Sequence, residues 1–185
     1  MEQQTIARYS TATRFLHWAT ALVVLIAYAY GPGGPEVRVY AAARDAERQL
    51  HETLGLVVLA LVVLRVLWRA FDTRPVQAPL ARWMDISARS VQMALYLLLF
   101  AVPLTAVAGA WLEGHPLTLL GAVTLASPWA ESHALGASIA RVHAWLGDAV
   151  IWLAGMHALA GLFHHYVLKD GVLESMLPRR RARSQ

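Results

Sequence analysis

The sequence predicts an all-α integral membrane protein, a bundle of four spanning helices with both termini in the cytoplasm. Of its 185 residues, 57% are hydrophobic and only 15% are charged, whereas about a quarter are charged in a typical soluble domain. Four stretches are long and apolar enough to cross a bilayer, which requires about 20 mostly apolar residues. Most Lys and Arg residues lie near the ends of these stretches that would share one side of the membrane, and such a bias indicates the topology.

The four predicted spans are residues 14–30, 46–71, 86–112 and 138–168. The cluster Gly31-Pro32-Gly33-Gly34-Pro35 ends the first span, and Arg74-Pro75 ends the second. Pro103 lies inside the third span and predicts a kink. Residues 113–137 are predicted to be a loop with a short interfacial helix carrying Trp129. The start of the chain lacks a cleavable signal pattern, so we expect the first span to be retained and residues 1–185 to form a single domain.

The distribution of the sixteen Lys and Arg residues predicts the orientation. If both termini and the second connection share one side, twelve of the sixteen lie there and four lie opposite. Positive residues favour the cytoplasmic side, so the two remaining loops are expected outside. The twelve are Arg8, Arg14, Arg65, Arg69, Arg74, Arg82, Arg89, Lys169, Arg179, Arg180, Arg181 and Arg183; the four are Arg38, Arg44, Arg48 and Arg141.

Composition also excludes several classes of function. The absence of cysteine excludes a disulfide framework, thiolate-held iron–sulfur clusters, Cys-ligated zinc, C-x-x-C-H haem attachment and a Cys nucleophile. The net charge of +4 would suit a nucleic-acid partner. However, the basic residues flank apolar spans instead of forming a soluble basic domain, so no nucleic-acid partner is expected. Eight histidines remain as the conspicuous chemistry.

Four of these histidines form two pairs at matched depths. His17 and His157 are expected toward the cytoplasmic ends of the first and fourth spans, and His51 and His143 near the outer starts of the second and fourth. Ionisable side chains within membrane helices are costly and mark functional sites. The fourteen residues from His143 to His157 place both rings on nearly one helix face, about 21 Å apart. Two imidazole pairs so spaced suit two six-coordinate haem b groups, bound non-covalently.

A small residue follows each of these histidines after one helical turn. A porphyrin plane standing off an imidazole would cross the helix at that point, where a large side chain would collide. Small residues also favour contact between membrane helices, so the pattern has two explanations. The four residues are Ala21, Gly55, Gly147 and Gly161.

Arginines lie near both pairs and can bind haem propionates through bidentate contacts. Arg44, Arg48 and His51 have a 0, 4, 7 spacing that would place them on one helical face. For the inner arginines, anchoring to lipid headgroups is an equal alternative. The outer candidates are Arg44, Arg48 and Arg141, and the inner ones are Arg14 and Arg65.

The other histidines carry weaker signals. A zinc site would need three or four ligands at one depth, and neither pair is obviously completed. His115 and His133 are expected to be solvent-exposed loop residues. His164 lies seven residues after His157, about 20° off its face and nearer the cytoplasm. It could hydrogen-bond a quinone carbonyl or relay a proton, and interfacial anchoring is an equal alternative.

Together these residues resemble the bacterial di-haem cytochrome b561 family, and within it the short four-helix members described as superoxide oxidases. The resemblance spans nearly the whole chain. Many relatives have a His near the start of the third helix, where this chain has Gln92, which leaves the role of that position open. The segments that carry the resemblance are Arg8-Tyr9-Ser10, Phe15-Leu16-His17-Trp18, His51-Glu52-Thr53-Leu54-Gly55, Val63-Leu64-Arg65, residues 96–103, 143–147 and 157–170, and Met176-Leu177-Pro178-Arg179.

The resemblance implies a superoxide:ubiquinone oxidoreductase in the bacterial inner membrane, with no obligate protein partner. Superoxide would be drawn to the outer arginines, and its electron would pass from the outer haem to the inner haem and on to ubiquinone. Protons would come from the cytoplasm, with His164 and Lys169 near the quinone.

Two other functions remain open. The chain could be a membrane anchor or electron conduit for a separate dehydrogenase or periplasmic redox partner, or a haem-sensing or structural subunit. Its short outer loops and its resemblance to stand-alone members favour the enzyme.

Overall fold

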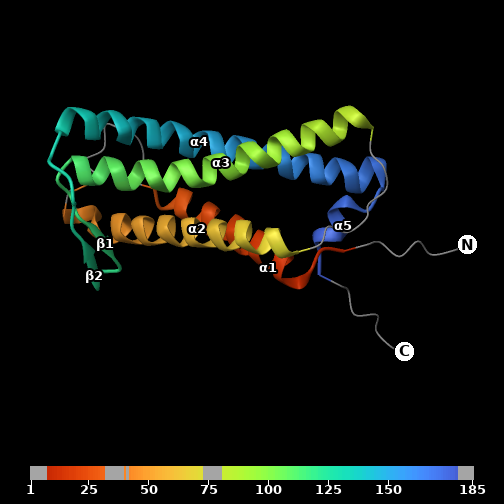
Figure 1. Cartoon of the computed structure of the whole chain (residues 1–185), viewed down its shortest axis with the longest axis horizontal. Coiled ribbons are helices and arrows are strands. Elements are labelled where there is room, and N and C mark those ends of the chain that lie inside the picture. The colour runs from red at the N-terminus through yellow and green to blue at the C-terminus, as the bar shows by residue number, and fades with distance from the viewer. Residues whose placement is uncertain (1–7, 32–39, 41, 73–80, 179–185) are drawn as a thin grey trace, which may run out of the picture.

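Four long helices dominate the computed structural model, which describes residues 8–31, 40, 42–72 and 81–178 (Figure 1). Each is long and apolar enough to cross a membrane, which confirms the four predicted spans. The breaker residues 32–35, the stop at residues 74–75 and the basic tail at 179–183 lie outside the described residues. The elements are α1 (Thr11–Ala29), η1 (Ala42–Arg44), α2 (Asp45–Phe71), α3 (Arg82–Leu112), β1 (Leu117–Leu119), β2 (Val123–Leu125), α4 (His133–Phe163), η2 (His164–Leu168) and α5 (Val172–Met176).

Several helices begin before the apolar stretches from which they were predicted, because their first turns are polar. Ser10 caps α1, its Oγ accepting a hydrogen bond from the Thr13 backbone N–H at 3.2 Å. The first turns of α3 contain an ion pair between Asp85 and Arg89. α3 continues through Pro103 without a break. The fourth span ends at Leu168 as predicted, and its last residues, η2, form a π-helix.

The connection between α3 and α4 is a β-hairpin, so the expected interfacial helix at Trp129 is wrong. β1 pairs antiparallel with β2, with Leu117 opposite Leu125. The hairpin is held to α2, because Glu52 accepts a hydrogen bond from the Thr118 N–H at 2.8 Å. This short segment satisfies its backbone groups by pairing with itself and with α2, which a single helical turn could not do. Trp129 lies in coil, edge-on to Trp111.

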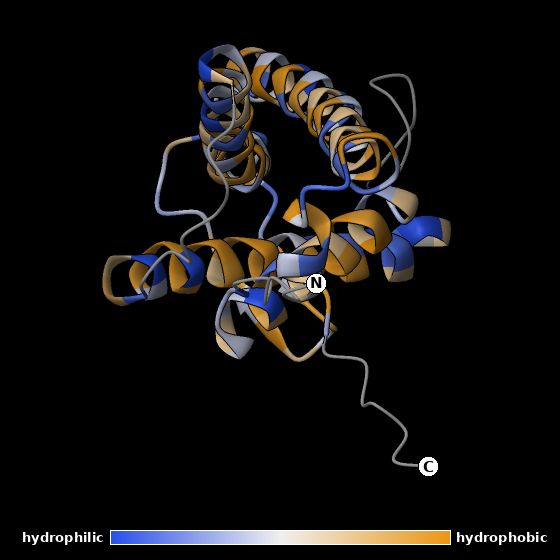
Figure 2. Cartoon of the chain, turned by 90° about the vertical axis from the view of Figure 1, so that its right-hand side faces the viewer, coloured by the Kyte–Doolittle hydropathy of each residue, from blue (hydrophilic) through white to orange (hydrophobic). Residues whose placement is uncertain are grey.

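The helices form two closely packed pairs, α1 with α2 and α3 with α4. α3 approaches α4 where two buried glycines meet: a Cβ added at Gly136 would lie 2.9 Å from the Glu113 backbone nitrogen, and one at Gly109 3.3 Å from the Ala140 nitrogen. Many large apolar side chains point outward, such as Trp152 at 77% exposure. Figure 2 shows hydrophobic residues along the helices, as contact with lipid requires.

The bundle has two distinct ends (Figure 1). We call the end with the starts of α1 and α3 and with α5 the inner end, and the end with η1 and the hairpin the outer end, after the orientation that the charges predict. At the inner end, Arg8 and Arg14 each donate a hydrogen bond to the Leu177 carbonyl at 2.8 Å. Trp18 donates to the Met176 carbonyl at 3.0 Å. The segment after α5 is therefore fastened to the start of α1.

Candidate functional site: two histidine pairs between the helix pairs

The structure brings the four membrane histidines together in two pairs. At the inner end, the ring centroids of His17 on α1 and His157 on α4 are 6.3 Å apart, with an interplanar angle of 75°. At the outer end, the centroids of His51 on α2 and His143 on α4 are 6.0 Å apart, at 84°. Each pair therefore joins α4 to one member of the opposite helix pair.

This separation matches two imidazoles on opposite sides of one metal ion. A metal–imidazole bond is about 2 Å long, and the ring centre lies about 1 Å beyond the ligating nitrogen, so two such rings have centroids about 6 Å apart. A zinc site would need further ligands. Among the described residues, no three His, Asp or Glu side chains converge as such a site requires. The geometry fits two axial ligands of one haem iron better than a cluster of protein ligands.

Backbone carbonyls orient both outer imidazoles. His51 Nδ1 lies 2.8 Å from the Ala27 carbonyl oxygen on α1, and His143 Nδ1 lies 2.8 Å from the Val102 carbonyl oxygen on α3. Because a carbonyl only accepts, each Nδ1 carries the hydrogen, and each Nε2 keeps a lone pair for a metal. Val102 immediately precedes Pro103, which has no backbone N–H to donate. These two carbonyl partners could not be predicted from the sequence, because any residue supplies a backbone carbonyl.

The inner imidazoles have a different environment. The Nδ1 of His17 is buried and has no hydrogen-bond partner among the described residues. Its ring lies edge-on to Trp18, with centroids 5.2 Å apart. The guanidinium of Arg65 lies close enough to His17 and His157 for its charge to act on both rings.

The glycines beside the histidines leave room for a flat group. A Cβ added at Gly55 or Gly147 would meet no atom within 4 Å, although both residues are only half-exposed. At Gly161 the nearest atom would be Leu173 Cδ1, at 3.8 Å. Ala21, the fourth small residue, is half-buried on α1. This open strip beside the ligand pairs is what a porphyrin needs, so the residues fit the group.

The close approach of Gly31 to His51 was not predicted from the sequence. A Cβ at this position would lie 3.4 Å from Cε1 of His51, so the glycine lets the chain after α1 pass close to that ring.

The inner arginines differ in what they bind. Arg65 stacks over the Tyr96 ring of α3, 5.3 Å from its centroid, and has no carboxylate partner among the described residues. Arg14 also donates to Thr11 Oγ1 at 3.2 Å, in addition to its bond to Leu177. Arg65 is therefore the inner guanidinium that remains available to a carboxylate from a bound group.

The outer arginines also differ. Arg48 is 12% exposed and pairs with Glu52 at 2.7 Å and with Asp45 at 3.2 Å. Arg44 is 45% exposed and lies 3.7 Å from Glu47. It lies in η1, ahead of α2, so the spacing argument for a shared helical face does not apply to it. Arg141 is exposed and donates to Ser138 Oγ at 3.0 Å.

An aromatic stack covers part of the outer end. The rings of Tyr40 and His115 stack with centroids 3.4 Å apart, and the Arg48 guanidinium lies 5.4 Å from the Tyr40 centroid. Burial, reinforced by the negative charges of Glu52 and Glu113, raises the pKa of Tyr40 to about 12. His115 was expected to face solvent; it is half-buried in this stack instead.

The remaining residues singled out in the sequence are not members of the two histidine pairs. His133 is the exposed first residue of α4, and Gln92 is half-buried on α3. At the inner end His164 Nδ1 lies 2.5 Å from Asp170, and Lys169 is exposed in the left-handed region with φ 54°.

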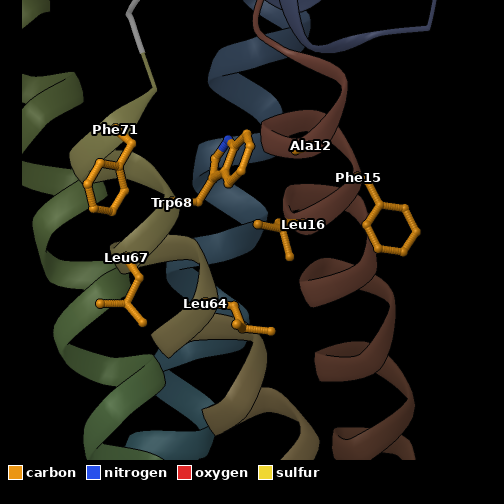
Figure 3. Close-up of a pocket in the computed structure, with 7 residues that line it drawn as sticks. All are labelled: Ala12, Phe15, Leu16, Leu64, Leu67, Trp68 and Phe71. Atoms are coloured by element: carbon orange, nitrogen blue, oxygen red, sulfur yellow. The ribbon is translucent and has the colours of Figure 1, made fainter.

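An apolar groove runs between α1 and α2 near the inner end (Figure 3). Its volume is about 350 Å³ and its walls are apolar throughout, so it suits acyl or isoprenoid chains and offers no group to hold a polar head. Its lining residues are Ala12, Phe15, Leu16, Leu64, Leu67, Trp68 and Phe71.

Comparison with known proteins identifies the family to which these histidine pairs belong. The sequence model of the prokaryotic cytochrome b561 family matches residues 8–179. The chain belongs to this family. It is 30% identical to cytochrome b561 homolog 2 of Escherichia coli over 94% of this chain and 93% of that protein. It is 30% identical to the probable superoxide oxidase CybB of Yersinia pestis (94% and 98%) and 32% identical to cytochrome b562 of Cereibacter sphaeroides (88% and 90%).

Membership of this family confirms the resemblance seen in the sequence. It makes the chain a multi-pass bacterial membrane protein that uses b-type haem for electron transfer, and so an oxidoreductase.

Proposed function

We propose that the chain carries electrons across the bacterial inner membrane through two b-type haems, oxidising superoxide at the outer end and reducing ubiquinone at the inner end. The termini lie in the cytoplasm in this proposal. The main support for this proposal is that two pairs of imidazole rings lie at opposite ends of one bundle, with ring centroids 6.3 Å apart in one pair and 6.0 Å apart in the other.

Each haem has an assigned set of protein groups in this proposal. His51 and His143 hold the outer haem, and His17 and His157 hold the inner one. Arg65 binds a propionate of the inner haem, because it is a cation near both inner imidazoles without a carboxylate partner among the described residues. Gly55, Gly147 and Gly161 would leave room for the porphyrins beside their ligands.

Haem iron between two imidazoles supplies reversible one-electron chemistry. Two superoxide anions each lose one electron and leave as oxygen, and one quinone takes up both electrons with two protons. The protein's tasks are to attract the anion, to hold the imidazoles and to deliver protons to the quinone.

The exposed arginines of the outer end attract the anion. Arg141, two residues before His143, and Arg44 present their guanidinium groups to solvent and raise the local concentration of superoxide. Arg48 has its charge offset by Glu52 and Asp45, so its main effect is to fix the outer end of α2.

The quinone lies at the inner end, near His164 and Lys169. His164 offers a ring nitrogen to a quinone oxygen, and Lys169 is an exposed cation at the predicted membrane surface. The Yersinia pestis relative, a probable superoxide oxidase that the chain matches over 98% of that protein's length, supports superoxide as the donor.

One experiment tests the reaction. The purified chain would be assayed for haem and examined by reduced-minus-oxidised spectroscopy, and then given a superoxide source with and without ubiquinone. We expect two b-type haems per chain that superoxide reduces and ubiquinone reoxidises. Two haems that ignore superoxide would contradict the proposed reaction and indicate a conduit for another redox protein. An absence of haem would contradict the assignment of the histidine pairs.

A further inference from the structure

Two histidine–carboxylate contacts involve successive residues of η2, His164 and His165. His164 Nδ1 is 2.5 Å from Asp170 Oδ2, and His165 Nδ1 is 2.7 Å from Glu174 Oε1. The side chains of the first pair are 14% and 16% exposed, and those of the second pair are 32% and 29% exposed. The His164–Asp170 contact is the more sheltered of the two and is a hydrogen bond, whereas the Nδ1 of His165 has no hydrogen-bond partner among the described residues.

The backbone is shaped to form these contacts. η2 widens the helix into a π-turn, a distortion that often occurs at functional sites. Lys169 and Gly171 then adopt positive φ angles of 54° and 79°, which reverse the chain so that Asp170 faces back toward His164. A left-handed lysine costs conformational energy that a plain helix end would avoid.

Asp170 is held from two sides. Its Oδ2 contacts His164, and its Oδ1 accepts a hydrogen bond from the Val172 backbone N–H at the start of α5, at 3.1 Å. A carboxylate fixed in this way orients the imidazole and stabilises its protonated form. Because Nδ1 of His164 donates to Asp170, Nε2 is the nitrogen left to give or take a proton.

We propose that His164, positioned by Asp170, donates protons to the quinone at the inner end and is reprotonated from water. The proposal rests on the proposed function, in which a quinone is reduced here. In each transfer the Nε2–H bond of the imidazolium breaks and an O–H bond forms on the quinone oxygen. The electrons come from the chain's electron-transfer activity. Two such transfers, each followed by reprotonation, supply the two protons of one quinol.

The charged and titratable groups around His164 come from several elements. Asp170 contacts the His164 ring, and Lys169 follows η2 directly. The neighbouring His165 contacts Glu174 of α5.

Three variants of the haem-loaded protein test this role. In H164A the donor is removed, and in D170N the carboxamide can still accept from Val172 but carries no charge. D85N removes an equivalent charge from the exposed Asp85–Arg89 pair at the same end and serves as the matched control. The haems are reduced beforehand, and their reoxidation by ubiquinone-1 is followed by stopped flow in H2O and D2O, with proton uptake recorded by a pH dye.

We expect H164A to slow reoxidation about a hundredfold, the usual scale for losing a general acid, and D170N to slow it about tenfold, with proton uptake slowed in step. Added imidazole should restore much of the rate in H164A, and the wild type should show a solvent isotope effect. D85N should match the wild type. Haem content and the reduction of the haems by superoxide should be unchanged in all three variants.

Wild-type rates in H164A and D170N would overturn the inference alone. Loss of rate in H164A without rescue by imidazole and without a solvent isotope effect in the wild type would also overturn it, because that pattern indicates a structural role. A wild type whose haems ubiquinone-1 fails to oxidise would contradict the proposed function itself and remove this inference with it.

Discussion

The outer and inner histidine pairs have nearly the same ring geometry and very different surroundings. Both outer imidazoles donate from Nδ1 to a backbone carbonyl, whereas the Nδ1 of His17 is buried without a partner among the described residues. Arg48, three residues before His51, is neutralised by carboxylates, and Arg141, two residues before His143, is exposed to solvent, which screens its charge. Arg65, near the inner pair, has no carboxylate partner in the described part of the chain.

These surroundings explain how one bundle can make two unequal redox sites. A hydrogen bond from Nδ1 increases the basicity of a ligating imidazole and favours the ferric state. An unpaired cation nearby favours the reduced state, which carries less positive charge. Both effects act in the same direction, so we expect the outer haem to have the lower midpoint potential. Electrons would then run downhill from the outer end to the inner end, as the proposed function requires.

Removing a ligand should have the largest effect and should divide the two sites. We expect H143A and H51A to reduce haem content from two to one per chain and to leave the inner haem spectrum unchanged. H17A and H157A should do the reverse. H133A, which changes an exposed histidine at the start of the same helix as His143, should retain both haems. Loss of both haems in every variant would contradict two independent sites.

Filling the open strip beside the outer pair should be nearly as damaging. A leucine at Gly147 would project into the space assigned to the porphyrin, so G147L should lose the outer haem. G155L is the matched control, since a Cβ there also meets nothing within 4 Å, but Gly155 is exposed on α4. The measurement is haem content per chain after purification. Equal haem content in the two variants would favour the alternative that the small residues serve only helix contacts.

Much of this site was predictable from the sequence, because its main signals are periodic and local. The apolar stretches fixed the four spans, and the fourteen-residue spacing placed His143 and His157 on one face of α4. Depth within the membrane then matched each with its partner on another helix. These inferences need only helix geometry and bilayer thickness.

The parts that could not be predicted depend on contacts between distant segments. The carbonyl partners of His51 and His143 are backbone atoms, which any residue could supply. The docking of the hairpin on α2, where Glu52 accepts a hydrogen bond from the Thr118 N–H, joins residues 66 positions apart. The approach of Asp170 to His164 required a π-turn and a left-handed lysine, for which the sequence has no clear mark.

Removing the inner cation should lower only one potential. R65Q takes away the guanidinium near the inner imidazoles, so we expect the midpoint potential of the inner haem to fall by roughly 60 mV, a tenfold change in a one-electron equilibrium. The outer haem should be unchanged. R69Q, one turn further along α2 and over the Tyr9 ring, is the control and should have a smaller effect. Equal shifts of both haems in R65Q would show that Arg65 does not belong to the inner site.

The two ends should also lose stability at opposite extremes of pH. Of the effects predicted here, this one should be the smallest. At the inner end, hydrogen bonds from Thr13 and Ser10 lower the pKa of Asp72, so its contribution exists above its ordinary pKa of about 4 and disappears as pH falls through the lowered value. At the outer end, the raised pKa of Tyr40 gives a contribution that is complete below about pH 10 and is lost toward its pKa of about 12.

Thermal melts in detergent check this contrast with D72N and Y40F. D72N should melt below the wild type at neutral pH and match it in acid. Y40F should keep more of its stability in alkali than the wild type. A constant difference across all pH values, for either variant, would show that the charge state of that residue does not matter.

The most direct test of the unequal pairs is a potentiometric titration of the wild type beside H143A and H157A. We expect two one-electron steps in the wild type, the lower one missing in H143A and the higher one missing in H157A. A single step in the wild type, or the opposite assignment, would contradict the claim that the outer haem has the lower midpoint potential.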